Sequence, residues 1–129
     1  LGFEVSATYG DSAVFLSAGG YHHHIGLNTW AGKGVKAPPL GHSGLYHFAV
    51  LLPSIKELAK VLKSLLDAKY PITGASDHGV SSAIYLEDPD GIGVEPYCDR
   101  PTEFWIKDGD GMVQMITKPL DIKALLLEL

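Results

Sequence analysis

The alternation of apolar and polar residues is clearest in the second half of the chain. Residues 45–53, LYHFAVLLP, are almost continuously apolar and predict a buried strand. Ser54 is then a candidate helix N-cap, because Glu57 three positions later completes a capping box. Apolar residues recur at helical spacing through 55–66, which predicts a helix lying on a sheet. The runs PITGAS, SSAIYLE and GVEPYC predict three further strands, so the order is β-α-β-β-β.

Residues 1–30 predict strands without a helix. The runs GFEVSATYG, DSAVFLSAGG and HHHIGLNTW are rich in β-branched and aromatic residues. The segment AVFLSAGGYHHHIGLN can be laid over AIYLEDPDGIGVEPYC without a gap, which predicts two copies of one module. The first copy lacks its opening strand and helix. A crossover of that kind needs a dozen or more residues, so we expect roughly 25 residues before Leu1.

These patterns predict a mixed α+β fold of paired modules within one domain, 1–129. Residues 1–30 form the partial first module, and 31–43 form a linker rich in glycine and proline. Residues 44–101 form the complete second module. Residues 102–129 are expected to form a hairpin around DGDG and a short apolar helix, DIKALLLEL.

Charge and cysteine content narrow the class of protein. The 129 residues carry a net charge of -5 with no run of Lys or Arg, so nucleic acid is not an expected partner. No apolar stretch approaches the length of a membrane span, so no membrane partner is expected either. The single cysteine, Cys98, excludes an internal disulfide framework and is typical of the reducing cytosol, which predicts a cytoplasmic protein.

Three segments resemble the vicinal oxygen chelate superfamily, which contains glyoxalase I, bleomycin-resistance proteins and extradiol ring-cleaving dioxygenases. They are GLYHFAVLLPS, GASDHGVSSAIYLEDPDG and VEPYCDRP. The likeness covers nearly the whole chain and is closest to the catechol 2,3-dioxygenase-like proteins of the glyoxalase family. It implies a sheet that curls around a metal cavity, and a small-molecule substrate that chelates the ion through two neighbouring oxygens. Because this scaffold hosts several reactions, the motifs are more specific for the fold than for the reaction.

His47 and Glu95 are the candidate metal ligands. A lone histidine in an apolar strand is usually a core residue bonded to a carbonyl, and a half-buried carboxylate is costly unless it is paired or binds metal. The resemblance matches His47 to the first-strand metal histidine and Glu95 to the last-strand metal glutamate of the second module. They supply part of a 2-His-1-carboxylate site, whose third ligand is expected upstream of Leu1. Fe(II) is the expected divalent metal, with Zn, Ni or Mn as alternatives.

The histidine run, His22, His23 and His24, is a candidate for proton transfer. Alternation along a strand would send His22 and His24 to one face and His23 to the other. The resemblance to extradiol enzymes implies that His24 is the acid/base, with His23 as the alternative. The ungapped module match pairs Glu95 with Ile25 and leaves the register open. A polar histidine run on a solvated strand is the alternative without a function.

Tyr85 and His78 are candidates for contact with substrate. Tyr85 lies ten residues before Glu95, a spacing similar to that of the active-site tyrosine of extradiol enzymes, although an aromatic residue there can simply pack. His78 precedes it on a loop or strand edge, where it either contacts substrate or stabilises a turn. The acidic segments EDPDG and DGDG lack calcium-loop spacing and predict turns. Cys98 is expected on the strand face opposite Glu95, without a cation nearby to make it reactive.

Three functions fit these residues, and extradiol ring cleavage is the leading one. In that reaction Fe(II) binds the catecholate and O2, His24 moves the proton, and Tyr85 or His78 bonds the substrate oxygen. A glyoxalase I-like lyase is the alternative enzyme, but it would more naturally carry a carboxylate in residues 12–30, where there is none. A metal-free resistance protein would have no need of the two candidate ligands.

A second copy of the chain is the other expected partner. The partial first module would leave strand edges and an apolar face uncovered, which promotes aggregation. We therefore expect upstream residues or a partner chain to cover these strands, and predict a homodimer.

Overall fold

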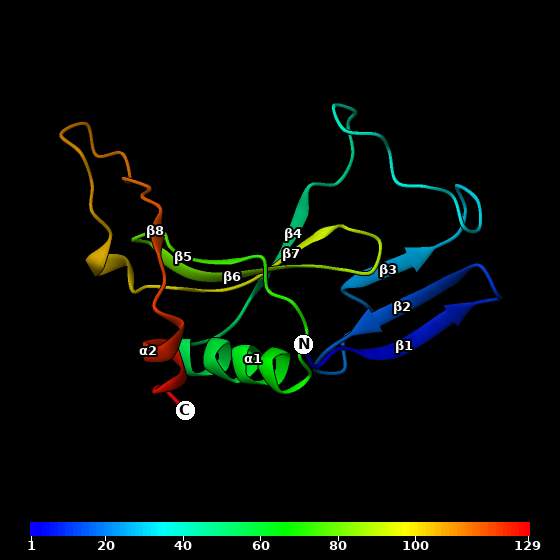
Figure 1. The fold of residues 1–129 in the computed structure, drawn as a ribbon, viewed down its shortest axis with the longest axis horizontal. Helices are drawn as coiled ribbons and strands as arrows, with labels where there is room; N and C mark the ends of the chain where they lie inside the picture. The colour runs from blue at the N-terminus through cyan, green and yellow to red at the C-terminus, as the bar shows by residue number, and fades with distance from the viewer. The chain divides into compact units, whose positions relative to one another are not determined.

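Eight strands and two α-helices form an α+β fold with two separate sheets (Figure 1). The computed structural model describes residues 1–129, which divide into two compact units, Leu1–Leu40 and Gly41–Leu129. The boundary falls within the predicted linker, where residues 29–46 contain no strand or helix. The predicted fold class is confirmed.

The first unit is a three-stranded antiparallel sheet in the order β1-β2-β3. Its strands are β1 (Glu4–Tyr9), β2 (Ala13–Ser17) and β3 (Ile25–Asn28). The predicted third strand is wrong at its start, because the histidine run lies before β3. The chain reverses direction at Gly19 and Gly20, which both have positive φ, and residues 21–24 belong to this connection and not to a strand. Strand alternation therefore does not decide which way these histidines point.

Pairing within the two sheets settles the register between the modules. Leu16 pairs with Ile25 in the first unit, whereas Leu86 pairs with Val94 in the second. The sequence repeat matches Leu16 on β2 with Leu86 on β6. With these two aligned, Ile25 corresponds to Val94, and Gly26 corresponds to Glu95. The connection in the first unit is thus one residue longer, and the ungapped match fails at this strand.

The second unit contains the predicted β-α-β-β-β module. It consists of β4 (His47–Leu51), α1 (Ile55–Asp67), β5 (Gly74–Asp77), β6 (Ser81–Glu87) and β7 (Gly93–Asp99). The five-stranded sheet has the order β4-β7-β6-β5-β8, in which β4 is parallel to β7 and the other pairs are antiparallel. The long connection that a parallel pair requires runs from β4 through α1, β5 and β6 to β7.

Helix α1 covers one face of this sheet (Figure 1). Ser54 caps it, as predicted, by accepting a hydrogen bond of 3.3 Å from the backbone N–H of Glu57, while the Glu57 side chain pairs with Lys60 instead of completing the capping box. The hydrophobic core joins α1, the sheet and the C-terminal helix through Leu58, Ala59, Leu62, Ile84, Cys98 and Leu125. Each large apolar side chain buried there contributes about 1.5–3 kcal/mol. Cys98 faces α1, so alternation along β7 places Glu95 on the opposite face, as predicted.

Strand β4 differs from its predicted buried state. It lies at the edge of the sheet beside β7, and its residues alternate between exposed and intermediate burial. His47, Ala49 and Leu51 are the exposed positions. An apolar run indicates a strand. It does not reveal that the strand lies at a sheet edge, paired with only one other strand, or that only one of its faces is covered.

The C-terminal segment adds a two-residue strand, β8 (Lys118–Pro119), and α2 (Ile122–Leu126). Asp121 caps α2 by accepting from two backbone N–H groups. The predicted DGDG turn is confirmed, because Asp108 accepts from the N–H groups of Asp110 and Met112. Asp88 holds the EDPDG turn in the same way. None of the helices has the length and apolar character needed to cross a membrane.

Candidate functional site

Four polar side chains line up on the sheet face opposite α1. They come from β4, β7, β6 and the turn after β5, and are His47, Glu95, Tyr85 and His78. Within the ladder Ala49 lies opposite Glu95, so His47, two residues before Ala49, shares its face. The structure thus brings together four of the five residues that the sequence singled out.

His47 and Glu95 form the closest pair of candidate ligands. Nε2 of His47 lies 3.1 Å from Oε2 of Glu95. The His47 side chain is 41% exposed, while that of Glu95 is only 16% exposed. A half-buried carboxylate is costly without a charged or hydrogen-bonded partner, and here it has two partners, one on each oxygen.

Gly93 makes room for His47, and sequence reasoning missed it. The two residues are partners in the parallel ladder between β4 and β7. A Cβ atom at Gly93 would lie 2.7 Å from Cβ of His47 and 2.8 Å from the carbonyl oxygen of Tyr46. Such contacts are too short for any side chain. Glycine inside a strand often marks a close approach of backbones, and this was the available signal.

Tyr85 connects Glu95 to His78. Its hydroxyl donates a hydrogen bond of 2.9 Å to Oε1 of Glu95. Burial, and then the hydrogen bond and the negative charge of Glu95, raise the pKa of Tyr85 to about 12. The hydroxyl therefore keeps its proton at neutral pH. Tyr85 is not merely a packing residue, which the sequence had left open.

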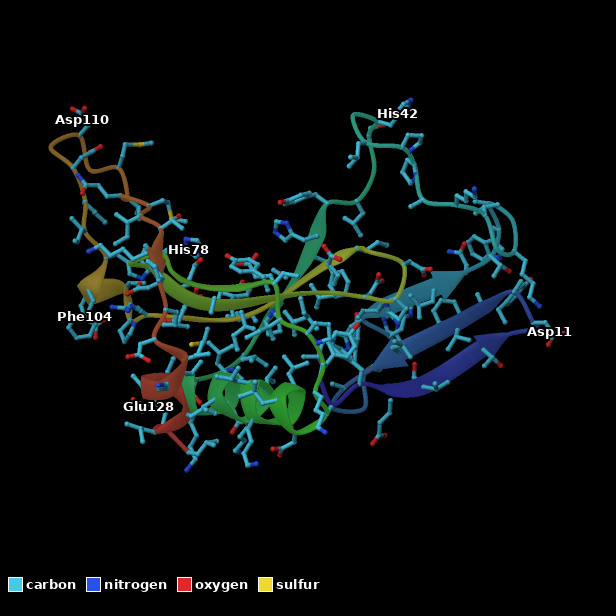
Figure 2. The ribbon with its side chains drawn as sticks, viewed as in Figure 1. Asp11, His42, His78, Phe104, Asp110 and Glu128 are labelled. Atoms are coloured by element: carbon cyan, nitrogen blue, oxygen red, sulfur yellow. The ribbon has the colours of Figure 1, made fainter.

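His78 completes the line of contacts and lies on the side of the sheet away from α1 (Figure 2). Its Nε2 lies 2.6 Å from the Tyr85 hydroxyl, and its Nδ1 lies 3.0 Å from the carbonyl oxygen of Ile116. A continuous series of polar contacts therefore runs from Ile116 through His78, Tyr85 and Glu95 to His47.

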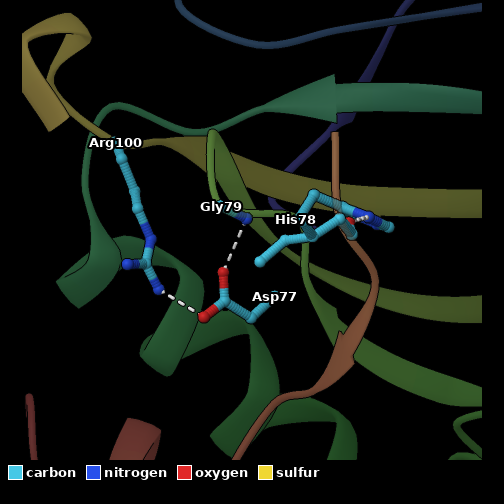
Figure 3. A network of polar contacts seen from close by, with 5 residues as sticks. Asp77, His78, Gly79 and Arg100 are labelled. Carbon is cyan, nitrogen blue, oxygen red and sulfur yellow. Dashed lines mark hydrogen bonds and ion pairs between the residues drawn. The ribbon is translucent and has the colours of Figure 1, made fainter. Parts of the chain in front are cut away.

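A tight turn presents His78, and an ion pair holds this turn (Figure 3). Oδ1 of Asp77 accepts from the N–H of Gly79 at 2.8 Å. The Arg100 guanidinium donates from Nη2 to Oδ2 of Asp77 at 2.7 Å. Sequence reasoning missed Asp77 and Arg100, because they lie 23 positions apart and no local pattern links them.

His24 lies in the first unit, in the turn before β3. Its Nδ1 accepts a hydrogen bond of 3.3 Å from the N–H of Ala18 and lies 3.3 Å from Oγ of Ser17. The ring packs near Phe3 and Tyr21, and its side chain is exposed. An acceptor role for Nδ1 puts the proton of the neutral ring on Nε2, which makes no hydrogen bond within the protein.

His22 and His23 contact each other instead. Their Nδ1 atoms lie 2.8 Å apart, and the His23 ring packs against Phe15. The first unit also contains an open cavity of about 600 Å³. Its lining includes Glu4, Ser17 and His22, but neither of the other two histidines.

The donor set at His47 and Glu95 is suited to a divalent metal. An imidazole nitrogen and a carboxylate oxygen, 3.1 Å apart on one open sheet face, can both bind one ion, because both are ligands of divalent metals. Tyr85 holds the second carboxylate oxygen and so fixes the orientation of Glu95. These residues supply two ligands, and no group of three or more His, Cys, Asp and Glu side chains gathers at one point.

Comparison with known proteins agrees with this fold. Residues 1–95 match the family model of the Glyoxalase/Bleomycin resistance protein/Dioxygenase superfamily. The chain is α+β, its second unit is a β-α-β-β-β module, and the family model covers most of its length. It belongs to this superfamily.

Two curated relatives carry dioxygenase names. The chain is 48% identical over 94 residues to catechol-2,3-dioxygenase of Bacillus subtilis (strain 168), and the match covers 73% of this chain and 33% of that protein. It is 30% identical over 86 residues to biphenyl-2,3-diol 1,2-dioxygenase 3 of Rhodococcus globerulus, covering 67% of this chain and 45% of that one. The matched part is therefore less than half the length of either relative.

Two solved structures share the fold at low sequence identity. A lactoylglutathione lyase from Agrobacterium tumefaciens aligns with a TM-score of 0.55 and 20% identity, over 75% of each chain. A glyoxalase/bleomycin resistance protein/dioxygenase from Alicyclobacillus acidocaldarius aligns with a TM-score of 0.59 and 12% identity, over 81% of this chain and 78% of that one. At these identities the likeness shows the fold and leaves the reaction open.

Proposed function

We propose that this chain is part of a metal-dependent enzyme of the extradiol ring-cleaving type, acting on a small molecule with two neighbouring oxygens. The observation that carries the proposal is the 3.1 Å pair of His47 and Glu95, in line with Tyr85 and His78 on one sheet face. The dioxygenase names of the two curated relatives support the same reaction class.

His47 and Glu95 would hold the ion, for which we propose Fe(II) before Zn, Ni or Mn. The bound ion would act as a Lewis acid toward the two substrate oxygens. Tyr85 stays protonated, since its pKa is raised to about 12, and it can donate a hydrogen bond to a substrate oxygen in place of Glu95. Nε2 of His78 lies 2.6 Å from the Tyr85 hydroxyl and can help to orient it.

His24 is the proposed acid/base. The N–H of Ala18 occupies Nδ1, so Nε2 is the atom at which the ring holds or releases a proton. This nitrogen has no hydrogen bond within the protein and can bond a substrate. His23 packs against Phe15 and is given no chemical role.

A glyoxalase-type reaction is less well supported by the first unit. There, Gly26 takes the ladder position that Glu95 has in the second unit. Glycine offers no carboxylate to a metal or to a substrate proton. A histidine can take the acid/base role in the ring-cleaving reaction, since imidazole gains and loses a proton near neutral pH.

The proposed assembly is a homodimer. In the first unit several large apolar side chains are exposed, among them Val5, Leu27 and Trp30. Exposed apolar groups beside unpaired strand edges favour association with another sheet or chain.

Glu95→Gln tests the metal site, using protein purified with its natural N-terminus and analysed by inductively coupled plasma mass spectrometry. The substitution keeps the shape of the side chain and removes its charge, so we expect metal affinity to fall at least about 10-fold. Glu87→Gln is the matched control, since Glu87 lies exposed on β6 and should leave the metal content unchanged. Full metal content in Glu95→Gln would disprove the site.

A further inference from the structure

We propose that Ile116 and the Asp77–Arg100 ion pair are positioning groups for His78, which they hold as the neutral tautomer protonated at Nδ1. Nε2 of His78 is then an acceptor 2.6 Å from the Tyr85 hydroxyl, whose one proton is donated either to Glu95 or to His78. The use of this His–Tyr pair in a reaction rests on the proposed function, but the tautomer itself does not.

The carbonyl of Ile116 decides the tautomer. A carbonyl oxygen only accepts hydrogen bonds, so a hydrogen bond across the 3.0 Å contact with Nδ1 of His78 requires Nδ1 to be the donor. The contact is two-sided, because the N–H of Ile116 donates to the carbonyl of His78 at 3.2 Å. The Thr117 hydroxyl, 3.3 Å from Nδ1, can accept from the same N–H. Proton donation from Nδ1 leaves the lone pair of a neutral imidazole on Nε2.

The Asp77–Arg100 pair fixes the backbone on the other side of His78 (Figure 3). Asp77 accepts a hydrogen bond from the N–H of Gly79 within the turn. It also pairs with Arg100, which follows the end of β7. The N–H of Arg100 also donates to the carbonyl of Val80 at 2.7 Å. Backbone and side chain of Arg100 therefore both hold the turn, and rotation of the His78 backbone away from Ile116 would break these bonds.

Tyr85 has one hydroxyl proton and two acceptors within hydrogen-bonding distance. These are Oε1 of Glu95 at 2.9 Å and the Nε2 lone pair of His78 at 2.6 Å. When Glu95 does not accept from Tyr85, the hydroxyl proton can be donated to His78 or to a substrate oxygen. A histidine with its proton on Nε2 could not take part in this exchange, because Nε2 would itself be a donor.

The tautomer is measured by NMR on protein with its natural N-terminus, labelled with ring-¹⁵N histidine, at a pH above the ordinary imidazole pKa of about 6.5. The signals of His78 are identified by their loss in His78→Gln. We expect a protonated Nδ1 and an unprotonated Nε2. A protonated Nε2 would overturn the proposal. Thr117→Val should leave the signals unchanged. A changed tautomer in that variant would show that the Thr117 hydroxyl, and not the Ile116 carbonyl, fixes the tautomer of His78.

Arg100→Gln tests the ion pair. We expect averaged ¹⁵N shifts from a mixture of tautomers, and kcat about 10-fold lower with little change in KM, because His78 is mispositioned while substrate binding persists. Arg100→Lys keeps a charged donor and should restore the Nδ1–H signal. Lys107→Gln, a change of another exposed cation, is the control. An unchanged tautomer in Arg100→Gln would exclude the ion pair from this role.

The two proposals fail separately. Full metal content in Glu95→Gln, with the Nδ1–H tautomer still observed, would refute the proposed metal site and leave the positioning of His78 intact. Loss of metal in Glu95→Gln, together with a protonated Nε2 of His78, would support the metal site and overturn the positioning of His78.

Discussion

The Tyr85 hydroxyl lies between two acceptors, 2.9 Å from Oε1 of Glu95 and 2.6 Å from Nε2 of His78. The carboxylate is the stronger acceptor, and its negative charge opposes the loss of the tyrosine proton. This contact joins the candidate metal ligands to the histidine held by the turn after β5. Tyr85 therefore connects the two ends of the line of polar contacts.

The stability of the protein should fall as pH rises from about 10 to about 12. Tyr85 has a pKa of about 12 in the folded protein against 10.0 normally, so its contribution is complete below pH 10 and is lost as pH rises through the folded value. Urea unfolding at several pH values in this window should show a smaller decline for Tyr85→Phe than for the unmodified protein. Tyr9→Phe, at an exposed position on β1, should keep the full decline.

Cys98 does not affect the comparison between the Tyr85→Phe and Tyr9→Phe variants. Burial raises the pKa of its thiol above the ordinary value, so it also contributes to the loss of stability at alkaline pH. Both tyrosine variants retain Cys98, so the difference between their declines does not come from Cys98. Equal declines in the two variants would contradict the raised pKa of Tyr85.

His24→Gln should lower turnover by about 10²-fold or more, because glutamine can form hydrogen bonds but cannot accept a proton in the reaction. Metal content should be unchanged, since His24 is not a proposed ligand. Steady-state kinetics and metal analysis of the same sample measure both quantities. His23→Gln serves as the control and should retain activity. Loss of metal in His24→Gln would make His24 a ligand instead.

Gly79→Ala should destabilise the second unit by about 1 kcal/mol or more, as measured by urea unfolding. Gly79 has a φ of +77°, and an added Cβ would lie 3.1 Å from Cγ1 of Ile116. Gly109→Ala is the matched control, because a Cβ there would meet nothing within 4 Å and its φ is not in the left-handed region. Equal stabilities of the two variants would show that the turn at Gly79 is not constrained as the structure has it.

Sedimentation equilibrium should give a mass twice that of one chain, for protein with its natural N-terminus. Leu27→Lys on β3 places a charge on a strand that is exposed in the single chain, where Leu27 is 51% exposed. If this strand contributes to the dimer, the variant should form a weaker dimer, with a larger dissociation constant than that of the unmodified protein. Leu127→Lys, also strongly exposed but on the C-terminal segment, is the control. A monomer at all concentrations would exclude the homodimer.

The sequence by itself determined the elements whose signals are local. The capping box at Ser54 and the helical spacing after it gave α1, and the short apolar runs gave the strands on either side. The order of these elements predicted the β-α-β-β-β module, while the parallel pairing of β4 with β7 was seen only in the structure. Alternation along β7 placed Glu95 and Cys98 on opposite faces. The family resemblance, which the family match confirms, drew attention to His47 and Glu95.

Tertiary structure decided what depends on residues far apart in the chain. His78 meets Ile116 across 38 positions, and Asp77 meets Arg100 across 23. The exposure of β4 follows from its place at the sheet edge, which its own apolar sequence does not encode. A hydrogen bond or an ion pair acts only over a few ångströms. Which side chains come that close depends on the register of neighbouring strands and on where each turn ends, and only the folded chain fixes these.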